Sequence, residues 1–419
     1  MQAFQIILIL AWRNLWRNKR RTILTAGVVS LGLALLLIFL GIGDGSHQQM
    51  IRGAVRLGGA HVAVQAAGYQ ARGGIERTIS ASDLARIYSW VQSRRDELGI
   101  THVLPRAFAS GLVSSADGAS GVRVIGLEPE KEKSFSSFHE KLVRGHFLAP
   151  GDDTGAVIGE GVARKLEIEP GEKFVLMVQG AHSPEIQSVL LRVSGVMQTG
   201  LEDFDQATIL ITLDTARELF GLDDQVHQVA IMLERQEQSE EAAREGNQVL
   251  AGELEVLSWQ ELMPELRDFI RIDDGGNYVF NAMFFLIISF LVANTLLMSV
   301  LERRREFALL DAIGFTPARR FVLVLVEAAW IAFLAVLVGT VLGYAGHLYL
   351  HYRGLPLSLF YSSEMAAAGT VIDPVIYSDL AWTRVVGSAL IVFFLTFILA
   401  LLPAWRGATG QDVQLLGQV

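Results

Sequence analysis

The sequence lacks cysteine and has little charge. None of its 419 residues is cysteine, and only 19% are charged. The absence of cysteine excludes disulfides, thiolate metal sites and cysteine nucleophiles, although it does not indicate the redox compartment. The scarcity of charge accompanies a hydrophobic fraction of 51%. This bias is unevenly distributed along the chain, so different segments must be interpreted separately.

Sequence motifs for the common catalytic and nucleotide sites are also missing. There is no Gly-x-x-x-x-Gly-Lys-Ser/Thr loop, no Gly-x-Ser-x-Gly elbow and no His-Glu-x-x-His pair. The chain therefore cannot hold ATP phosphates in a P-loop of its own, and we predict no catalytic, cofactor-binding or metal-binding residues. His347 and His351 lie one helical turn apart, a spacing compatible with a metal. Without a visible third ligand, a membrane-interface position is the favoured interpretation.

Four segments carry no charged residue at all: Thr22–Ile42, Tyr278–Leu301, Ala328–Gly346 and Val385–Leu402. A helix needs about 20 apolar residues to cross the hydrocarbon core, so each segment predicts a transmembrane span. The first could instead be a signal peptide. Its apolar run is longer than usual for one and no cleavage site follows promptly, which favours an uncleaved anchor.

The distribution of Lys and Arg predicts the orientation. Eleven lie on one side of the spans and about six near their other ends. The eleven are Arg13, Arg17, Lys19, Arg20, Arg21, Arg303, Arg304, Arg305, Arg319, Arg320 and Arg406. Both termini are therefore expected in the cytoplasm, and residues 43–277 outside. Asp44–Asn277 holds 36 acidic and 22 basic residues, which makes nucleic acid an unsuitable partner.

The expected fold is a four-helix membrane protein in a 1+3 arrangement with a large inserted α+β domain. The predicted segments are a cytoplasmic or interfacial helix (1–21), span 1 (22–42), the external domain (43–277), span 2 (278–301), a cytoplasmic helix (302–320), span 3 (321–347), an external loop (348–383), span 4 (384–403) and a cytoplasmic tail (404–419). For residues 4–21, helical spacing of apolar residues favours an amphipathic helix in the headgroup plane. A disordered basic tail is the alternative.

The external segment mixes strand and helix patterns. Strands are predicted at His61–Gln65, Gly121–Ile125, Phe174–Val178 and Val189–Val193, and helices at Ser82–Leu98, Asp214–Phe220 and Glu237–Leu250. Two lobes are expected, without a definable boundary. Asp273–Gly276, with two acids and two glycines, predicts a hinge leading back into the membrane.

A few residues within the spans suggest specific contacts. Gly339 and Gly343 form a small-x3-small pattern, which allows close helix packing but also fits the ordinary glycine tolerance of membrane helices. Asn294 lies mid-span and should hydrogen-bond across a protein interface. Glu327 lies near a span end, where it could reach cytosolic water or a basic partner, or act in a proton relay.

Between the second and third spans, Glu302–Pro317 predicts a short amphipathic helix. Phe307, Leu310 and Ile313 form an apolar stripe among Arg and Glu residues, and Gly314 and Pro317 should end the helix. Such a helix could dock into a groove on a soluble protein or lie on the membrane as a connector. The pattern alone does not separate these two possibilities.

The motif Glu302-Arg-Arg-Arg-Glu306-Phe, continued by Ala312-Ile-Gly314, resembles the coupling helix of the ABC permeases grouped with MacB, FtsX and the lipoprotein-releasing complex. Further similar stretches are Ala11–Thr22, Arg144–Leu148, Val157–Leu166 with Pro170, and Pro403–Ala408 with Asp412–Val413, although Trp405 and Gly407 weaken the usual basic pattern of the last. Thr199–Asp205 with Leu213–Leu219 looks closest to the lipoprotein-releasing branch. The resemblance spans the whole chain.

The resemblance implies a non-catalytic permease in the bacterial inner membrane, with its large domain in the periplasm. Two copies of a separate cytosolic ATPase, which bind ATP and Mg, would dock on the coupling helix. The implied coupling residues are Glu302, Arg303, Arg304, Arg305, Glu306, Phe307, Leu310, Ile313 and Gly314. A second permease copy or paralogue, and a periplasmic carrier or adaptor, are further implied partners.

The function implied is extraction of lipoproteins or other amphiphiles by mechanical transmission. An acyl chain would enter from the outer leaflet beside the first and second spans. The candidate cavity residues are Phe39, Leu40, Ile42, Phe280, Phe284 and Phe285, which could equally pack or face lipid. The alternatives are an FtsX-like regulator of a periplasmic hydrolase and a MacB-like exporter of drugs or peptides. MacB carries a fused ATPase, which this chain lacks.

Overall fold

The computed structural model describes residues 2–17, 19–182, 185–312, 314–357, 365–367 and 369–409. It divides into two compact units. The membrane unit consists of residues 1–48, 271–361 and 374–419, and the α+β unit of residues 49–270 and 362–373. Asp412–Val413, part of the family-like C-terminal stretch, lies outside the described residues.

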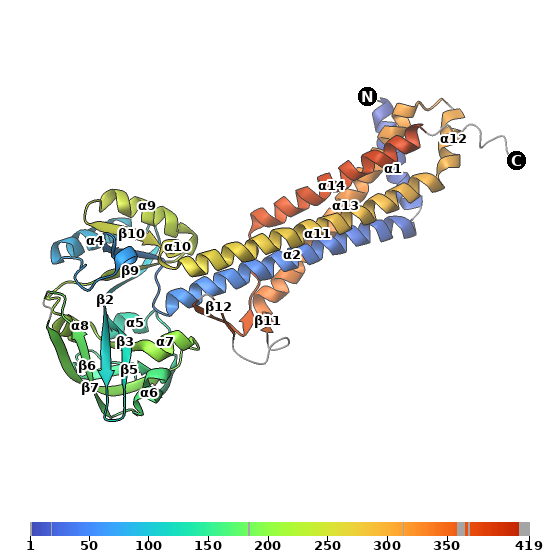
Figure 1. Ribbon diagram of the computed structural model, residues 1–419. Helices are drawn as coiled ribbons and strands as arrows, with labels where there is room; N and C mark the ends of the chain where they lie inside the picture. The colour runs from blue at the N-terminus through green and yellow to red at the C-terminus, as the bar shows by residue number, and fades with distance from the viewer. Residues whose placement is uncertain are drawn as a thin grey trace. The chain divides into compact units, whose positions relative to one another are not determined.

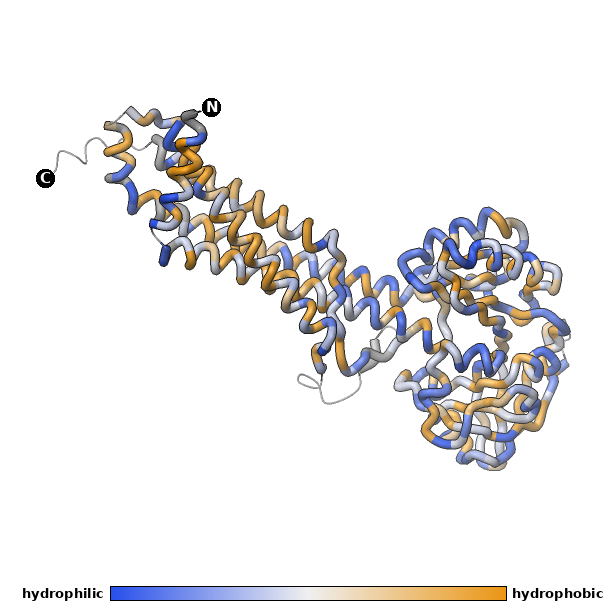
Figure 2. Tube along the Cα trace, turned by 180° about the vertical axis from the view of Figure 1, so that it is seen from behind, coloured by the Kyte–Doolittle hydropathy of each residue, from blue (hydrophilic) through white to orange (hydrophobic). Residues whose placement is uncertain are grey.

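Long apolar helices build the membrane unit. Among the described residues, four helices are long and apolar enough to cross a membrane. They are α2 (Lys19–Arg56), α11 (Pro264–Glu302), α13 (Pro317–Arg353) and α14 (Trp382–Thr409). Each contains one of the charge-free segments. The four helices run side by side (Figure 1), and most of the residues along them are hydrophobic (Figure 2). The predicted membrane-helical fold is confirmed.

Close backbone contact joins α2 to α13. A Cβ atom added at Gly339 would lie 2.8 Å from the backbone oxygen of Ser30, and one at Gly343 would lie 3.0 Å from Cα of Ala34. The Ser30 hydroxyl lies 2.9 Å from the carbonyl oxygen of Ala335 and donates to it across the contact. The small-x3-small pattern therefore allows α2 and α13 to pack closely, because a residue larger than glycine at these two positions would collide with α2.

The N-terminal helix α1 (Gln2–Arg17) packs on α13. Ile7 and Ala11 are buried against Leu323, and the rings of Trp12 and Trp330 meet edge to face at 5.0 Å. The predicted amphipathic helix is present. Part of its apolar face is covered by α13 rather than left for lipid.

A mixed sheet forms the centre of the α+β unit. Its strand order is β10-β1-β9-β2-β3-β8-β5-β7-β4, and β6 pairs with β2 and β7. The strands are β1 (Val62–Ala66), β2 (Ile100–Ser114), β3 (Ala119–Leu127), β4 (Leu142–Gly145), β5 (Gly155–Gly159), β6 (Lys173–Gln179), β7 (Ile186–Met197), β8 (Thr208–Thr212), β9 (Gln228–Leu233) and β10 (Leu254–Ser258). After α13, β11 (Leu355–Pro356) pairs with β14 (Val375–Ile376), and β12 (Met365–Ala367) with β13 (Thr370–Ile372).

Helices cover this sheet, and polar side chains cap some of them. They are α3 (Tyr69–Arg72), α4 (Ala81–Arg94), α5 (Pro129–Lys133), α6 (Glu160–Leu166), α7 (Glu202–Ala207), α8 (Leu213–Phe220), α9 (Ser239–Val249) and α10 (Trp259–Leu262). Ser80 caps α4 by accepting from the Asp83 amide, and Thr212 caps α8 by accepting from the Thr215 amide. The predicted strands and helices are confirmed within a few residues of their expected ends.

The predicted hinge at Asp273–Gly276 is wrong, because α11 continues through it without interruption. Two helical glycines cost about 1 kcal/mol each. Neighbouring contacts offset this cost, since His47 Nε2 lies 2.7 Å from Asp273 Oδ2 and the Asn277 amide donates to the same oxygen at 3.1 Å. This helical segment is therefore in contact with a residue of α2.

Candidate functional site

The segment between α11 and α13 forms a separate short helix, α12 (Arg304–Ala312). Gly314 follows with a φ of +87°, a left-handed conformation that glycine adopts without strain, and Pro317 is the first residue of α13. The predicted amphipathic helix is thus present, bounded by the predicted glycine. It therefore lies in the chain between two of the helices that are long and apolar enough to cross a membrane.

Arg303, in the turn before α12, holds this segment against α13. Its side chain is 10% exposed and its Nη1 lies 2.6 Å from Oε2 of Glu327, which is 11% exposed. The Asn14 amide of α1 donates to the other carboxylate oxygen of Glu327 at 2.6 Å. The guanidinium also lies 5.4 Å from the centre of the Phe307 ring. Glu327 therefore joins α1, α13 and the turn, and its basic partner belongs to its own chain.

Glu306 extends this network toward solvent. It accepts a hydrogen bond from Arg303 Nε at 2.8 Å and another from Arg17 of α1. Burial alone would raise the pKa of Glu306, but the hydrogen bonds from Arg17 and Arg303 outweigh it and hold the pKa below its ordinary value. The carboxylate stays ionised at neutral pH, so the ion pair between Arg17 of α1 and Glu306 of α12 remains formed.

The apolar stripe of α12 points inward. Phe307 is 1% exposed and packs with Val300, Val324 and Ala404, and Leu310 packs partly against the same cluster. The stripe predicted to meet a partner therefore binds this chain's own helices, because α11, α13 and α14 supply the nearer apolar surface. Ile313 lies outside the described residues, as do the side chains of Arg304 and Arg305.

The outward face of α12 carries a residue that the sequence pattern did not single out. Leu309 is 60% exposed, and Glu302 and Gly314 are exposed beside the ends of the helix. Leu309 lies two residues from Phe307, so helical geometry turns it away from the buried stripe. A large apolar side chain among the charged residues of this short helix could have been noticed as the odd member of the polar face.

The candidate cavity residues divide into two groups. Phe39 of α2 and Phe280 of α11 are exposed, and their ring centres lie 6.1 Å apart. Leu40, Phe284 and Phe285 instead pack against the buried core of the membrane unit, and Ile42 is half-buried. Of the six candidate residues, Phe39 and Phe280 are therefore the two most exposed aromatic side chains.

One face of the β2-β6-β7 strands leaves apolar side chains uncovered. Ile186 is 71%, Leu190 53% and Leu112 44% exposed. Cross-strand register places Val175 opposite Leu190 and Met177 opposite Leu112, on the same side of the sheet. The other side is the core, which includes Val113, Leu176 and Leu191. The sequence signal was the run Phe174–Val178, apolar on both faces, although only one face is covered.

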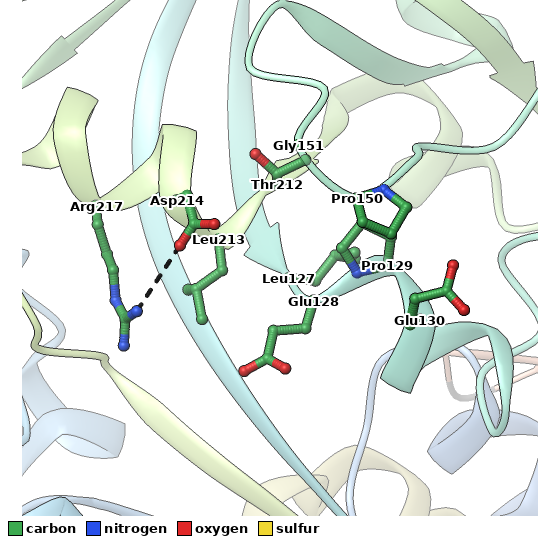
Figure 3. A pocket seen from close by; sticks show the side chains of 10 residues that line it. All are labelled: Leu127, Glu128, Pro129, Glu130, Pro150, Gly151, Thr212, Leu213, Asp214 and Arg217. Carbon is green, nitrogen blue, oxygen red and sulfur yellow. Dashed lines mark ion pairs between the residues drawn. The ribbon is translucent and has the colours of Figure 1, made fainter.

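A pocket of about 260 Å³ opens between the start of α5, the loop at Pro150 and the start of α8. Figure 3 shows Glu128, Glu130 and Asp214 around it, with Arg217 4.0 Å from Asp214. Glu128 is paired with Lys131 at 2.7 Å, and the Thr212 hydroxyl lies 2.8 Å from that of Thr215 at the helix cap. These groups are engaged in local structure, so the pocket does not present a nucleophile with a base.

The histidine pair of α13 is held by the loop before α14. His347 Nδ1 lies 2.8 Å from the Ser378 hydroxyl, and His351 Nδ1 lies 2.9 Å from the Ser378 carbonyl oxygen. Across the described residues, no group of three or more His, Asp or Glu side chains could hold a metal ion. Nearby, Arg384 of α14 pairs with Asp44 of α2 at 2.8 Å. These contacts tie three helices together at this end of the membrane unit.

Comparison with known proteins identifies both units. Residues 22–249 match the MacB-like periplasmic core domain, and residues 278–411 match the FtsX-like permease C-terminal domain. The lipoprotein-releasing system transmembrane protein LolC of Neisseria meningitidis is 23% identical over 336 residues, covering 77% of this chain and 76% of that protein. An uncharacterised ABC transporter permease of Methanocaldococcus jannaschii is 22% identical, and the alignment covers 66% of this chain and 65% of that protein.

Solved structures are similar to the α+β unit at low identity. The periplasmic region of MacB from Actinobacillus actinomycetemcomitans aligns at 11% identity with a TM-score of 0.35, covering 52% of this chain and 98% of that one. The two family-model matches fall in both units of the chain and include α12, α13, α14 and most of α2 and α11. This chain belongs to the MacB/FtsX/LolC family of ABC transporter permeases.

Proposed function

We propose that this chain is the permease subunit of a transporter that transmits ATP-driven motion from a separate cytosolic ATPase to its periplasmic domain, and so releases lipoproteins or other amphiphiles from the membrane. The observation that carries this proposal is the coupling segment. Arg303 and Glu327 fasten the start of α12 to α13, and Glu306 joins it to α1. Motion imposed on α12 would therefore move several helices together.

The proposed orientation places α12 and both termini in the cytoplasm. It is supported by the eleven basic residues at that side of the spans. Leu309 and Glu302 would then face the ATPase, while Phe307 and Leu310 hold α12 to its own membrane unit. In this assignment Arg303 positions the helix and does not touch the partner.

The proposed substrate is an acylated molecule, and two apolar surfaces support it. Phe39 and Phe280 offer exposed aromatic rings beside the lipid. The uncovered face of β2-β6-β7 offers a site outside the membrane for a carrier or adaptor. Removing an acyl chain from lipid costs about 0.8 kcal/mol per CH₂. Release consequently needs both external work and an apolar acceptor.

The coupling assignment predicts the effect of a single substitution at Leu309. Leu309→Asp should abolish stimulation of the cognate ATPase, because it places a charge in the apolar centre of the contact. Leu309→Met should keep at least half of the stimulation, since it preserves apolar volume. The measurement is ATP hydrolysis by the ATPase, with and without each purified permease variant in lipid nanodiscs.

Copurification is the control for this experiment. The wild-type chain should retain an ABC ATPase in detergent, and Leu309→Asp should lose it while eluting at the wild-type size. Full ATPase stimulation by Leu309→Asp would remove α12 as the docking element. If the permease stimulates its ATPase but releases no acylated substrate, the result would favour the alternative function, an FtsX-like regulator of a periplasmic hydrolase.

A further inference from the structure

Beside the side chains that pack on α13, the helix α1 carries an exposed apolar stripe. Ile9, Trp12 and Trp16 follow one another by three and four residues, so they share one face of the helix, and they are 60%, 38% and 51% exposed. The rings of Trp12 and Trp16 lie 5.9 Å apart. The buried residues Ile7 and Ala11 lie on a different face. We call Ile9, Trp12 and Trp16 the outer stripe of α1.

Basic residues without an acidic partner lie next to the outer stripe. The first 43 residues of the chain hold five basic and no acidic side chains. Arg17 pairs with Glu306 of α12. In contrast, Arg13, Lys19 and Arg20 are exposed and form no ion pair within the part of the chain that the structure describes. The charge of these three residues is therefore available to a ligand.

A hydrogen bond fixes the junction between α1 and α2, where these charges lie. The first helix ends at Arg17 and the second begins at Lys19, and the Thr22 hydroxyl donates to the Leu15 carbonyl oxygen at 2.8 Å. The charge-free run of α2 begins at Thr22 itself. Basic residues that immediately precede a membrane span lie at the level of the lipid headgroups.

We propose that the outer stripe, together with Arg13, Lys19 and Arg20, binds acidic phospholipids of the cytoplasmic leaflet, and that the bound lipid holds α1 against α12. Tryptophan favours the headgroup region, and an apolar side chain beside it enters the boundary with the acyl chains. Lipid phosphates supply the negative charge that residues 1–43 lack. Each Lys or Arg near an acidic surface strengthens binding about fivefold, so three of them give roughly a hundredfold preference over neutral lipid.

Lipid bound at this surface would act on the coupling helix through α1. Arg17 donates a hydrogen bond to Glu306 of α12. The Asn14 amide donates to Glu327 of α13 at 2.6 Å. Both α1 and α12 lie at the same end of the membrane unit (Figure 1). The Arg17–Glu306 pair is exposed, and such pairs add little stability by themselves. Lipid that holds α1 in place would keep this pair formed. The inference rests on the proposed function, in which α12 meets the ATPase.

The absence of cysteine allows lipid contact to be measured on the permease alone. Ile9→Cys, labelled with a polarity-sensitive fluorophore, is placed in nanodiscs of phosphatidylcholine, either pure or mixed with phosphatidylglycerol. The emission should shift to shorter wavelength when phosphatidylglycerol is present, because the acidic lipid draws the outer stripe deeper into the headgroup layer. Adding Arg13→Gln, Lys19→Gln and Arg20→Gln to the labelled chain should remove the shift.

A matched control removes the same number of charges elsewhere. Arg52, Arg271 and Arg353 are exposed and belong to the opposite ends of α2, α11 and α13. The triple variant Arg52→Gln, Arg271→Gln and Arg353→Gln should keep the emission shift of the labelled chain. This control separates a specific basic surface from the general effect of lowering the positive charge of the protein.

The second measurement is ATP hydrolysis by the cognate ATPase in the same nanodiscs, with unlabelled permease. The wild type should stimulate hydrolysis about threefold more with phosphatidylglycerol than without it, because bound lipid keeps α1 on α12. The variant with glutamine at positions 13, 19 and 20 should stimulate hydrolysis equally in both lipids. The control variant should retain the response of the wild type.

Two results would overturn the acidic-lipid surface: an emission from labelled Ile9→Cys that is the same in both lipids, or a shift that survives the loss of the three charges at positions 13, 19 and 20. If that loss lowers stimulation equally in both lipids, the basic residues contact the ATPase instead. An emission shift combined with lipid-independent stimulation rejects the connection to α12. If no lipid supports stimulation while the shift persists, the proposed function fails and the lipid surface stands.

Discussion

At the residue scale, two buried ion pairs join separate segments of the chain. Arg106 and Glu132, both 1% exposed, pair at 2.6 Å, and Arg106 also donates to the carbonyls of Gly58 and Gly59 just beyond the end of α2. Arg303 and Glu327 repeat the arrangement in the membrane unit. Removing one member of such a pair leaves an uncompensated charge, so these contacts specify the positions of the chain segments they join.

Two buried histidines in the α+β unit act as neutral acceptors. His61 Nδ1 accepts from the Leu233 amide at 2.9 Å, and His227 Nδ1 accepts from the Phe108 amide at 3.0 Å. Burial lowers the pKa of His61 to about 4 and also lowers the pKa of His227. Protonating either nitrogen would break its bond to the strand backbone, because a protonated nitrogen cannot accept.

This predicts that acid destabilises the α+β unit. The unfolded chain binds a proton at His61 below pH 6.5, while the folded chain does so only near pH 4, so stability is complete above pH 6.5 and falls between these values. The loss from His61 should reach about 3 kcal/mol. The urea midpoint for proteolytic cleavage of this unit, measured on the full chain at pH 7.5 and 4.5, checks it. His61→Gln should flatten the pH dependence; an equally steep profile would contradict the assignment.

At the element scale, the glycines of α13 set its distance from α2. Adding Cβ at Gly339 would place it 2.8 Å from a backbone oxygen, which cannot move without displacing the helix. Gly387 of α14 differs from Gly339, because nothing lies within 4 Å of a Cβ atom added there. The same residue type is obligatory in one helix and replaceable in another.

Gly339→Val should therefore lower the thermal stability of the membrane unit and break the Ser30–Ala335 hydrogen bond. The expected loss is about 1–3 kcal/mol, typical of overpacking. Gly387→Val is the matched control and should change stability by less than about 0.5 kcal/mol. The readout is the melting temperature in detergent. Equal melting of both variants would mean that α2 and α13 are not held at this spacing.

The sequence predicted elements more reliably than the contacts between them. Phe174–Val178 and Val189–Val193 were recognisable as strands because β-branched and apolar residues dominate them, and periodicity is a local property. Contacts depend on which surface comes nearest. Phe307 lies on a correctly predicted stripe, yet the pattern could not show that α13 and α14 cover it. Asp273–Gly276 has the composition of a turn, but His47 in α2 supports it as helix.

The candidate site was predictable to a similar extent. The short helix α12 and its bounding Gly314 follow from amphipathic spacing and the family-like motif. Glu327 was noticeable as an acid near a span, but its pairing with Arg303 joins residues 24 positions apart across a turn. Leu309 was missed because its exposure depends on the direction in which α12 packs. Long-range pairing and helix orientation require the structure.

At the scale of the whole molecule, the two units are joined through helices that belong to both. The α2 helix runs from Lys19 to Arg56 and α11 from Pro264 to Glu302, while the unit boundaries fall within them, after residues 48 and 270. Beyond the boundary, the end of α2 is fixed to the α+β unit: Ser137 donates to the Arg56 carbonyl and Arg106 to those of Gly58 and Gly59. A continuous helix transmits displacement, whereas a flexible linker would absorb it.

A five-residue Gly-Ser insertion after Gln48 should therefore separate ATP hydrolysis from substrate release. Stimulation of the ATPase depends on α12 and should persist, while release of an acylated substrate from proteoliposomes should fall at least tenfold, because the inserted coil no longer carries motion along α2. The same insertion at Gly252, in an exposed turn with nothing within 4 Å of an added Cβ, should leave both activities intact. If release survived the insertion in α2, the motion would have to travel through α11 alone, and the same insertion after Ile270 would then be the one that abolishes it.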